Sequence, residues 1–105
     1  MKTIENKDDY SQLIALDKPI LLDFFADWCG PCQTLLPTID KLSKEYEGKV
    51  EVQKVNIDQN RELAAQFGVR SIPALFFLKN SKIVDRTNGL QLESVLREKL
   101  DALLD

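Results

Sequence analysis

The sequence predicts an α/β domain, in which a central mixed β-sheet of about four to five strands is flanked by about four helices. In the first two thirds of the chain, short apolar segments alternate with amphipathic ones, which is typical of parallel strands joined by helical crossovers. The last third has two strand-like segments around a turn and then one helix. This indicates a hairpin, and therefore antiparallel strands in the same sheet.

The composition is that of one globular domain over residues 1–105. Hydrophobic residues make up 44% of the chain and charged residues 30%, and 105 residues are enough for one core but not for two. A net charge of −3 gives no basic surface for nucleic acid. No apolar run reaches the ~20 residues that span a membrane, and the first nine residues carry no apolar segment of a secretory signal. We therefore expect a cytoplasmic protein without nucleic-acid or membrane partners. We also expect a monomer, because no sizeable apolar stripe is left over once the predicted helices and sheet are paired.

The segment before the cysteines contains three predicted elements. Lys2–Glu5 is a short edge strand, and Asn6 is positioned to cap a helix over Lys7–Leu16. The run from Pro19 to Ala26 is almost continuously apolar, which suits a strand that is covered on both faces.

A helix over Gln33–Tyr46 follows the cysteines. Its apolar residues recur at helical spacing: Leu35, Leu36, Ile39, Leu42 and Tyr46. Pro37 lies inside it and should bend the axis, and Gly48 ends it. Lys49–Ile57 has the β-branched content of another strand.

The second half of the chain begins with a helix that Asp58 or Asn60 caps and that ends at Phe67. Ala74–Leu78 and Lys82–Thr87 are the two strands of the hairpin, with Asn80-Ser81 as the turn. The last helix follows Gly89 and carries a leucine-rich stripe. In that helix, Glu93 and Arg97 have the spacing of a stabilising pair, which we expect on the outer side.

The segment Trp28-Cys29-Gly30-Pro31-Cys32 contains the only two cysteines and the only tryptophan of the chain. It lies where a buried strand meets a helix. If Cys29 occupies the N-cap, unpaired backbone N–H groups and the helix dipole favour its thiolate, the form that attacks disulfides. Cys32 lies one turn later on the same face, within reach of a disulfide. Gly30 permits close approach by a substrate, and Pro31 stiffens the loop.

These residues imply a two-step exchange. Cys29 attacks a substrate disulfide and forms a mixed disulfide, and Cys32 then attacks Cys29 and releases the reduced substrate. The chain has no histidine, so another group must accept the proton of Cys32. Asp23, a lone carboxylate in the apolar strand, is the candidate base, because burial should raise its pKa toward the working pH. Lys54, on the next predicted strand, is a partner that limits this rise.

The chain resembles the thioredoxin family over nearly its whole length. The residues that carry the resemblance are Asp23-Phe-Phe-Ala-Asp-Trp-Cys-Gly-Pro-Cys32, Pro37, Val55-Asn-Ile-Asp58, Ile72-Pro73 and Gly89. The resemblance implies the thioredoxin fold and an electron carrier that reduces protein disulfides, with Cys29 as nucleophile, Cys32 as resolving cysteine and a buried Asp23–Lys54 pair. It further implies a redox-active Cys29–Cys32 disulfide without a bound cofactor, and re-reduction by an NADPH-dependent thioredoxin reductase.

The resemblance also implies a substrate groove around the cysteines. Pro73 would be a cis proline that faces them, and the backbone of Ile72 would pair with an extended substrate. Gly89 would lie on the same groove, and Trp28 would shield the site.

Four positions depart from the commonest pattern of the family. Phe25 stands where a second tryptophan is frequent, Gln33 replaces a lysine, and Ser81 replaces a glycine in the hairpin turn. Asn88 replaces a small apolar residue beside the groove. None of the four is expected to touch the reacting groups, but Gln33 and Asn88 bear on redox potential and partner preference.

Two other functions fit the same residues. One is a redox-silent binding module in which the thiols are incidental, and the other is an oxidase or isomerase of an oxidising compartment. Structural zinc is disfavoured, because two cysteines without a histidine do not supply four ligands.

Overall fold

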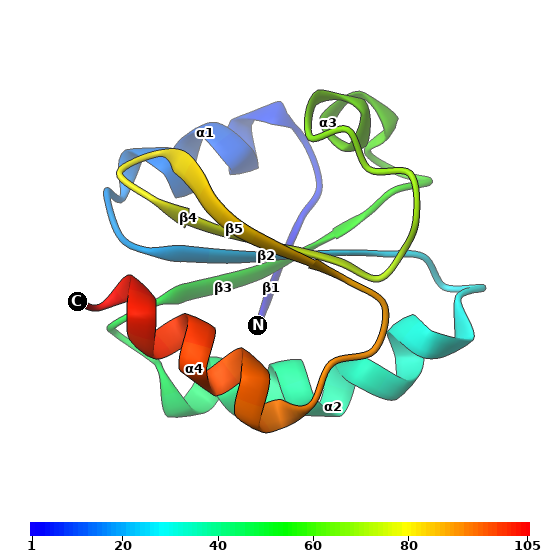
Figure 1. The fold of residues 1–105 in the computed structure, drawn as a ribbon. Helices are drawn as coiled ribbons and strands as arrows, with labels where there is room; N and C mark the ends of the chain where they lie inside the picture. The colour runs from blue at the N-terminus through cyan, green and yellow to red at the C-terminus, as the bar shows by residue number, and fades with distance from the viewer.

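Five strands and four helices alternate along the chain, and the strands form one mixed sheet (Figure 1). The structure is a computed structural model that describes residues 1–105. This is the predicted α/β arrangement. The elements are β1 (Lys2–Ile4), α1 (Lys7–Ala15), β2 (Ile20–Phe25), α2 (Gly30–Glu45), β3 (Glu51–Asn56), α3 (Arg61–Gln66), β4 (Ala74–Lys79), β5 (Lys82–Asn88) and α4 (Glu93–Leu103).

The sheet has the strand order β1-β3-β2-β4-β5, and its pairing changes from parallel to antiparallel at β2. On one side of β2, strands β3 and β1 are parallel to it, whereas β4 on its other side is antiparallel. The hairpin partner β5 is antiparallel to β4 and forms the second edge. All residues of β2 are buried, which explains why its sequence is apolar almost without interruption.

The helices cover both faces of the sheet. α1 and α3 lie on one face, and α2 and α4 lie on the other (Figure 1). Side chains alternate along each strand, so each face has its own core. The core under α2 and α4 includes Leu21, Leu35, Ile39, Leu42, Phe77, Leu96 and Leu100. The core under α1 and α3 includes Leu13, Leu22, Phe24, Val55, Phe67 and Phe76.

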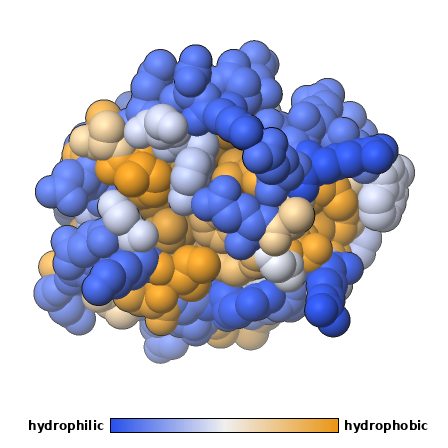
Figure 2. All heavy atoms as spheres, turned by 90° about the horizontal axis from the view of Figure 1, so that it is seen from above, coloured by the Kyte–Doolittle hydropathy of each residue, from blue (hydrophilic) through white to orange (hydrophobic).

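The outer surface of the α1 and α3 layer is mainly polar. Figure 2 looks onto this layer and shows mostly hydrophilic side chains, with hydrophobic side chains visible between them. This is the pattern of amphipathic helices whose apolar sides face the sheet. None of the four helices combines the length and the apolar character that crossing a membrane requires.

Helix α2 begins three residues earlier than the sequence analysis placed it. Its first residue is Gly30, so Gly30 and Pro31 belong to the first turn and Cys29 is the N-cap. Proline is tolerated there because the first N–H groups of a helix have no partner within it. The helix continues through Pro37 to Glu45. The early start is what places Cys29 at the helix terminus.

The expectation for Glu93 and Arg97 is wrong in one respect. The two side chains do pair, at 3.1 Å, but they face α2 instead of the outer side. The Arg97 guanidinium also donates two hydrogen bonds of 2.9 Å to Glu45 at the end of α2. The long guanidinium side chain reaches the neighbouring helix and binds its carboxylate with two parallel N–H groups, a geometry that arginine favours. The cluster therefore joins α2 to α4.

The N-cap of α3 is Asn60, one of the two expected candidates, but its side chain does not cap the helix. Its amide instead donates to the backbone carbonyl of Ile4 at 3.0 Å and to that of Asn56 at 3.4 Å. The side chain thus fastens the end of β1 to the segment after β3.

The turn between β4 and β5 holds a strained residue. Asn80 and Ser81 both have positive φ, of 54° and 64°, as two-residue hairpin turns of the favoured type require. Asparagine tolerates this region, whereas serine is disfavoured there by about 1–2 kcal/mol.

Ser81→Gly is expected to stabilise the protein by about 1 kcal/mol, because glycine removes the strain but loses more freedom on folding. Urea denaturation of the variant and the parent measures this difference. Ser81→Ala is the matched control and should show no gain. A glycine variant less stable than the parent would contradict the assignment of strain to this turn.

Candidate functional site

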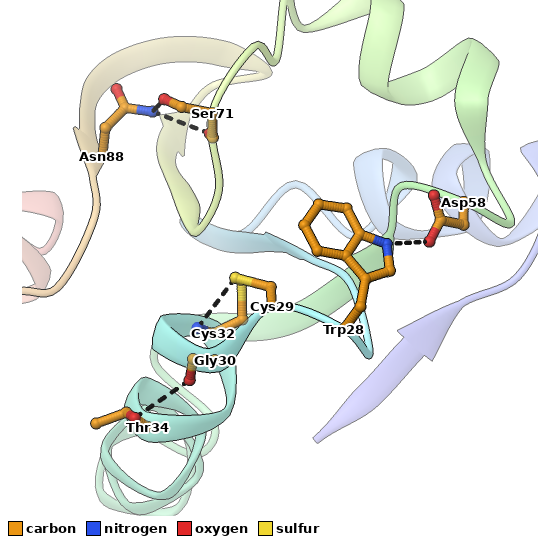
Figure 3. The surroundings of a disulfide bond; sticks show 8 residues. All are labelled: Trp28, Cys29, Gly30, Cys32, Thr34, Asp58, Ser71 and Asn88. Atoms are coloured by element: carbon orange, nitrogen blue, oxygen red, sulfur yellow. Dashed lines mark hydrogen bonds between the residues drawn. A yellow bond between two sulfur atoms is a disulfide. The ribbon is translucent and has the colours of Figure 1, made fainter.

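The two cysteines lie where β2 ends and α2 begins, at one end of the sheet. Cys29 and Cys32 form a disulfide with their Cα atoms 5.2 Å apart, and their exposed fractions are only 5% and 3%. They form a small apolar cluster with Phe25 and Ala26, the last residue of β2 and the residue that follows it. The end of the buried strand thus packs against the redox pair. Figure 3 shows the disulfide at the start of α2 with the residues around it.

The sulfur of Cys29 caps helix α2. Its Sγ accepts a hydrogen bond of 3.2 Å from the backbone N–H of Cys32. A sulfur at this position faces unpaired N–H groups and the positive end of the dipole of a 16-residue helix. When the disulfide is reduced, the same groups stabilise a thiolate at Cys29. The prediction that Cys29 is the N-cap is confirmed.

Trp28 is exposed and is fixed by a hydrogen bond to the segment that follows β3. The side chain is 68% exposed, and its indole N–H donates to the carboxylate of Asp58 at 2.8 Å (Figure 3). The Asp58 backbone N–H in turn donates to the side-chain oxygen of Asn56 at 2.9 Å. The indole is therefore held in place beside the disulfide. Asp58 and Asn56 were not predicted to take part in the site, although both lie in a motif that the sequence analysis singled out.

Ile72 packs against the cysteines, and the residue after it, Pro73, is hydrogen-bonded to Gly89. The Ile72–Pro73 peptide bond is cis, and Pro73 is buried. Ile72 packs against the apolar cluster that contains both cysteines. The backbone N–H of Gly89 donates to the carbonyl of Pro73 at 2.8 Å, and Gly89 has a positive φ of 79° that favours glycine. The loop before β4 therefore packs against the redox pair through Ile72, and Gly89, the residue after β5, holds this loop.

Asp23 is a buried carboxylate in the middle of the sheet. Its exposed fraction is 1%, and it is in register with Lys54 on β3 and Leu75 on β4. Its Oδ1 is buried without a hydrogen-bond partner. Burial raises the pKa of Asp23 to about 7, and the positive charge of Lys54 opposes this rise. A carboxylate with this pKa can exchange a proton near neutral pH, which is what a general base requires.

Lys54 acts on Asp23 by its charge and also lies over the ring of Phe25. The ring centroid of Phe25 lies 5.4 Å from the lysine Nζ, within the range of a cation–π contact. Lys54 also lines a surface cavity with Gln33 and Pro37. Phe25, which was not expected to touch the reacting groups, belongs to the same cluster as both cysteines and lies beside Lys54. Gln33 is exposed.

The site holds no group of three or more metal-ligating side chains. Its chemistry is that of two sulfurs, one helix terminus and one buried carboxylate. Such an arrangement can exchange a disulfide with an external dithiol, because one sulfur is activated by the helix and the second can close the ring.

The comparisons with known proteins agree over nearly the whole chain. The thioredoxin family model matches residues 2–102. A thioredoxin from Chlorobaculum thiosulfatiphilum is 40% identical over 96 residues, which cover 91% of this chain and 89% of that protein. One from Haemophilus influenzae is 49% identical over 81 residues, covering 77% of this chain and 76% of the relative.

Solved structures show the same fold. Fasciola hepatica thioredoxin is 40% identical and superimposes with a TM-score of 0.89, covering 97% of this chain and 98% of the other. A point mutant of Halobacterium salinarum thioredoxin is 30% identical with a TM-score of 0.91, covering 99% of this chain and 90% of the other. With the cysteine pair at disulfide distance, these matches favour a thiol–disulfide oxidoreductase over the redox-silent and oxidising alternatives. The chain belongs to the thioredoxin family.

Proposed function

We propose that this single domain reduces disulfides of protein substrates in the cytoplasm and is re-reduced by a thioredoxin reductase at the expense of NADPH. The observation that supports this most directly is the position of Cys29, whose sulfur caps α2 and whose apolar cluster packs against Ile72. Only the two cysteines of the site are present, as suits a protein of a reducing compartment. We infer that the chain acts as a monomer, without nucleic-acid or membrane partners and without a bound cofactor.

In the first step the thiolate of Cys29 attacks one sulfur of the substrate disulfide. A bond forms between Cys29 and that sulfur, the substrate S–S bond breaks, and the second substrate sulfur leaves as a thiolate that takes up a proton. The helix terminus stabilises the attacking anion. Gly30 has open space beside its Cα, and Pro31 restrains the loop, so an approaching chain meets little obstruction there.

In the second step Cys32 resolves the mixed disulfide. Asp23 accepts the proton of the Cys32 thiol, and the resulting thiolate attacks the sulfur of Cys29. The Cys29–Cys32 disulfide forms, the bond to the substrate breaks, and the substrate leaves as a dithiol after taking up a proton. Two electrons pass from the protein to the substrate. Lys54 moderates the basicity of Asp23 by opposing the rise of its pKa.

We propose that the substrate binds between Trp28 on one side and Ile72, Pro73 and Gly89 on the other. Trp28 is exposed and fixed by Asp58, so its indole offers a rigid apolar surface beside the disulfide. We propose that the backbone of Ile72 pairs with an extended substrate segment, as one strand pairs with the next.

The reduction potential decides between a reductant and an oxidant. We expect a reduction potential of about −270 mV, as in thioredoxins. A strong periplasmic oxidant has a reduction potential of about −120 mV. Equilibration of the protein with mixtures of reduced and oxidised dithiothreitol, followed by thiol alkylation and mass spectrometry, gives this value. Cys32→Ser is the control for non-specific oxidation. A potential near that of the periplasmic oxidant would overturn the proposed direction of electron flow.

A further inference from the structure

Asn88, the last residue of β5, binds the loop that carries Ile72 and Pro73. Its side-chain Nδ2 donates to the backbone carbonyl of Ser71 at 3.3 Å and to the hydroxyl of Ser71 at 3.2 Å. Figure 3 shows the Asn88 amide reaching across to Ser71, on the side of the disulfide away from Trp28. Asn88 also ends the ladder of β5 opposite Ala74, so the rigid hairpin holds its backbone.

The orientation of this carboxamide is fixed by its partner. The carbonyl oxygen of Ser71 can only accept a hydrogen bond, so the NH₂ group of Asn88 must face it. The amide oxygen then points away from Ser71, as Figure 3 shows. The side chain therefore acts on the loop through its N–H groups.

The loop is fastened at two points on either side of Ile72. Asn88 holds Ser71, and the backbone N–H of Gly89 holds the carbonyl of Pro73 at 2.8 Å. Ile72 lies between these points and packs against the cysteine cluster. A hydrogen bond from a strand end to each flank restricts the rotation of the peptide groups of Ile72.

We propose that Asn88 is a positioning residue that, through Ser71, fixes the backbone of Ile72 for extended protein substrates and so makes the protein selective for them. This inference rests on the proposed function, in which that backbone pairs with the substrate. A small apolar residue at position 88 would lack the N–H groups and leave the loop fastened by Gly89 alone.

The selectivity is tested with two disulfides of different kind. Insulin offers an extended backbone, whereas dithiodipyridine has none and tests only the sulfur chemistry. In Asn88→Leu, which has a similar shape but no N–H groups, the ratio of kcat/KM for insulin to that for dithiodipyridine should fall about five-fold, the value of about one hydrogen bond.

Gln66→Leu is the matched control, because Gln66 is an exposed carboxamide near the hairpin turn, at the other end of β4 and β5. It should leave the ratio unchanged. A ratio equal to that of the parent in Asn88→Leu would overturn the inference.

A second measurement does not depend on turnover. Amide exchange of Gly89 in the oxidised protein reports how often its bond to Pro73 opens, and it should be about five-fold faster in Asn88→Leu than in the parent or in Gln66→Leu. Unchanged exchange would show that Asn88 does not fasten the loop.

The failure of the proposed function and the failure of this inference give different results. If the parent reduced neither disulfide, the proposed function would fail. If the parent were active and Asn88→Leu kept the ratio and the exchange rate of the parent, only the inference would fail.

Discussion

Cys29→Ser is expected to lose disulfide reduction almost completely, with insulin turnover at least about three orders of magnitude below that of the parent. The reaction needs a sulfur anion that can form and break S–S bonds, and a serine hydroxyl does neither. The helix terminus that stabilises the thiolate cannot compensate, because a hydroxyl stays protonated near neutral pH. Reduction of insulin with dithiothreitol as the electron donor, corrected for the rate without protein, measures this loss.

Cys32→Ser is the matched partner of this variant, and its expected behaviour is different. The first step should proceed and the second should not, so a mixed disulfide between Cys29 and the substrate should accumulate. Mass spectrometry of the alkylated protein after mixing with a disulfide-linked peptide detects it. Turnover that persists in Cys29→Ser would contradict the catalytic role. A mixed disulfide formed by Cys32 in the Cys29→Ser variant, at the rate of the parent, would mean that the two roles are reversed.

The order of the elements could be predicted because each depends on residues near one another in sequence. The almost continuous apolar run of β2 predicted a strand covered on both faces, and all of its residues are buried. The thiol pair could be placed at a helix terminus from the strand before it and the helix after it. The start of α2 was misplaced because Gly30 and Pro31 disfavour a helix interior but are accepted in its first turn.

The contacts that complete the site connect segments far apart in the sequence. The indole of Trp28 is held by Asp58, and Asn88 is held against Ser71. Neither pair has a spacing that local rules recognise, since both depend on which loops the sheet brings to one end. The cis bond before Pro73 likewise follows from the family resemblance and not from the residue pattern. Periodicity and capping rules therefore predict the sheet and the thiol pair, but not these side-chain contacts around the disulfide.

Asp23→Asn is expected to stabilise the oxidised protein by up to about 4 kcal/mol at alkaline pH and to have little effect on stability below about pH 4. Burial raises the pKa of Asp23 from its ordinary value of 3.8 to about 7, and a tenfold change in proton affinity corresponds to about 1.4 kcal/mol. Below pH 3.8 the carboxyl is protonated in both the folded and the unfolded states, so it makes no pH-dependent contribution.

Between pH 3.8 and about pH 7 the Asp23 carboxyl is ionised in the unfolded chain and protonated in the folded protein. The free energy of unfolding therefore falls as the pH rises through this range. Above about pH 7 both states are ionised, and the full destabilisation remains constant. Asparagine has nearly the shape of the protonated acid and cannot ionise, so the variant avoids this loss. The difference in unfolding free energy between variant and parent should therefore grow from about pH 4 to about pH 7 and then level off.

Urea denaturation of the oxidised proteins across this pH range measures that difference. Asp27→Asn is the matched control, because Asp27 is an exposed carboxylate in the loop after β2, and it should show no such rise. A difference that is independent of pH would mean that Asp23 is ionised in the folded protein throughout this range.

The carboxylate that weakens the fold is also the proposed base for Cys32, so the same variant should resolve the mixed disulfide more slowly than the parent near neutral pH. A stable variant with unchanged resolution would separate the two effects and remove Asp23 from the mechanism.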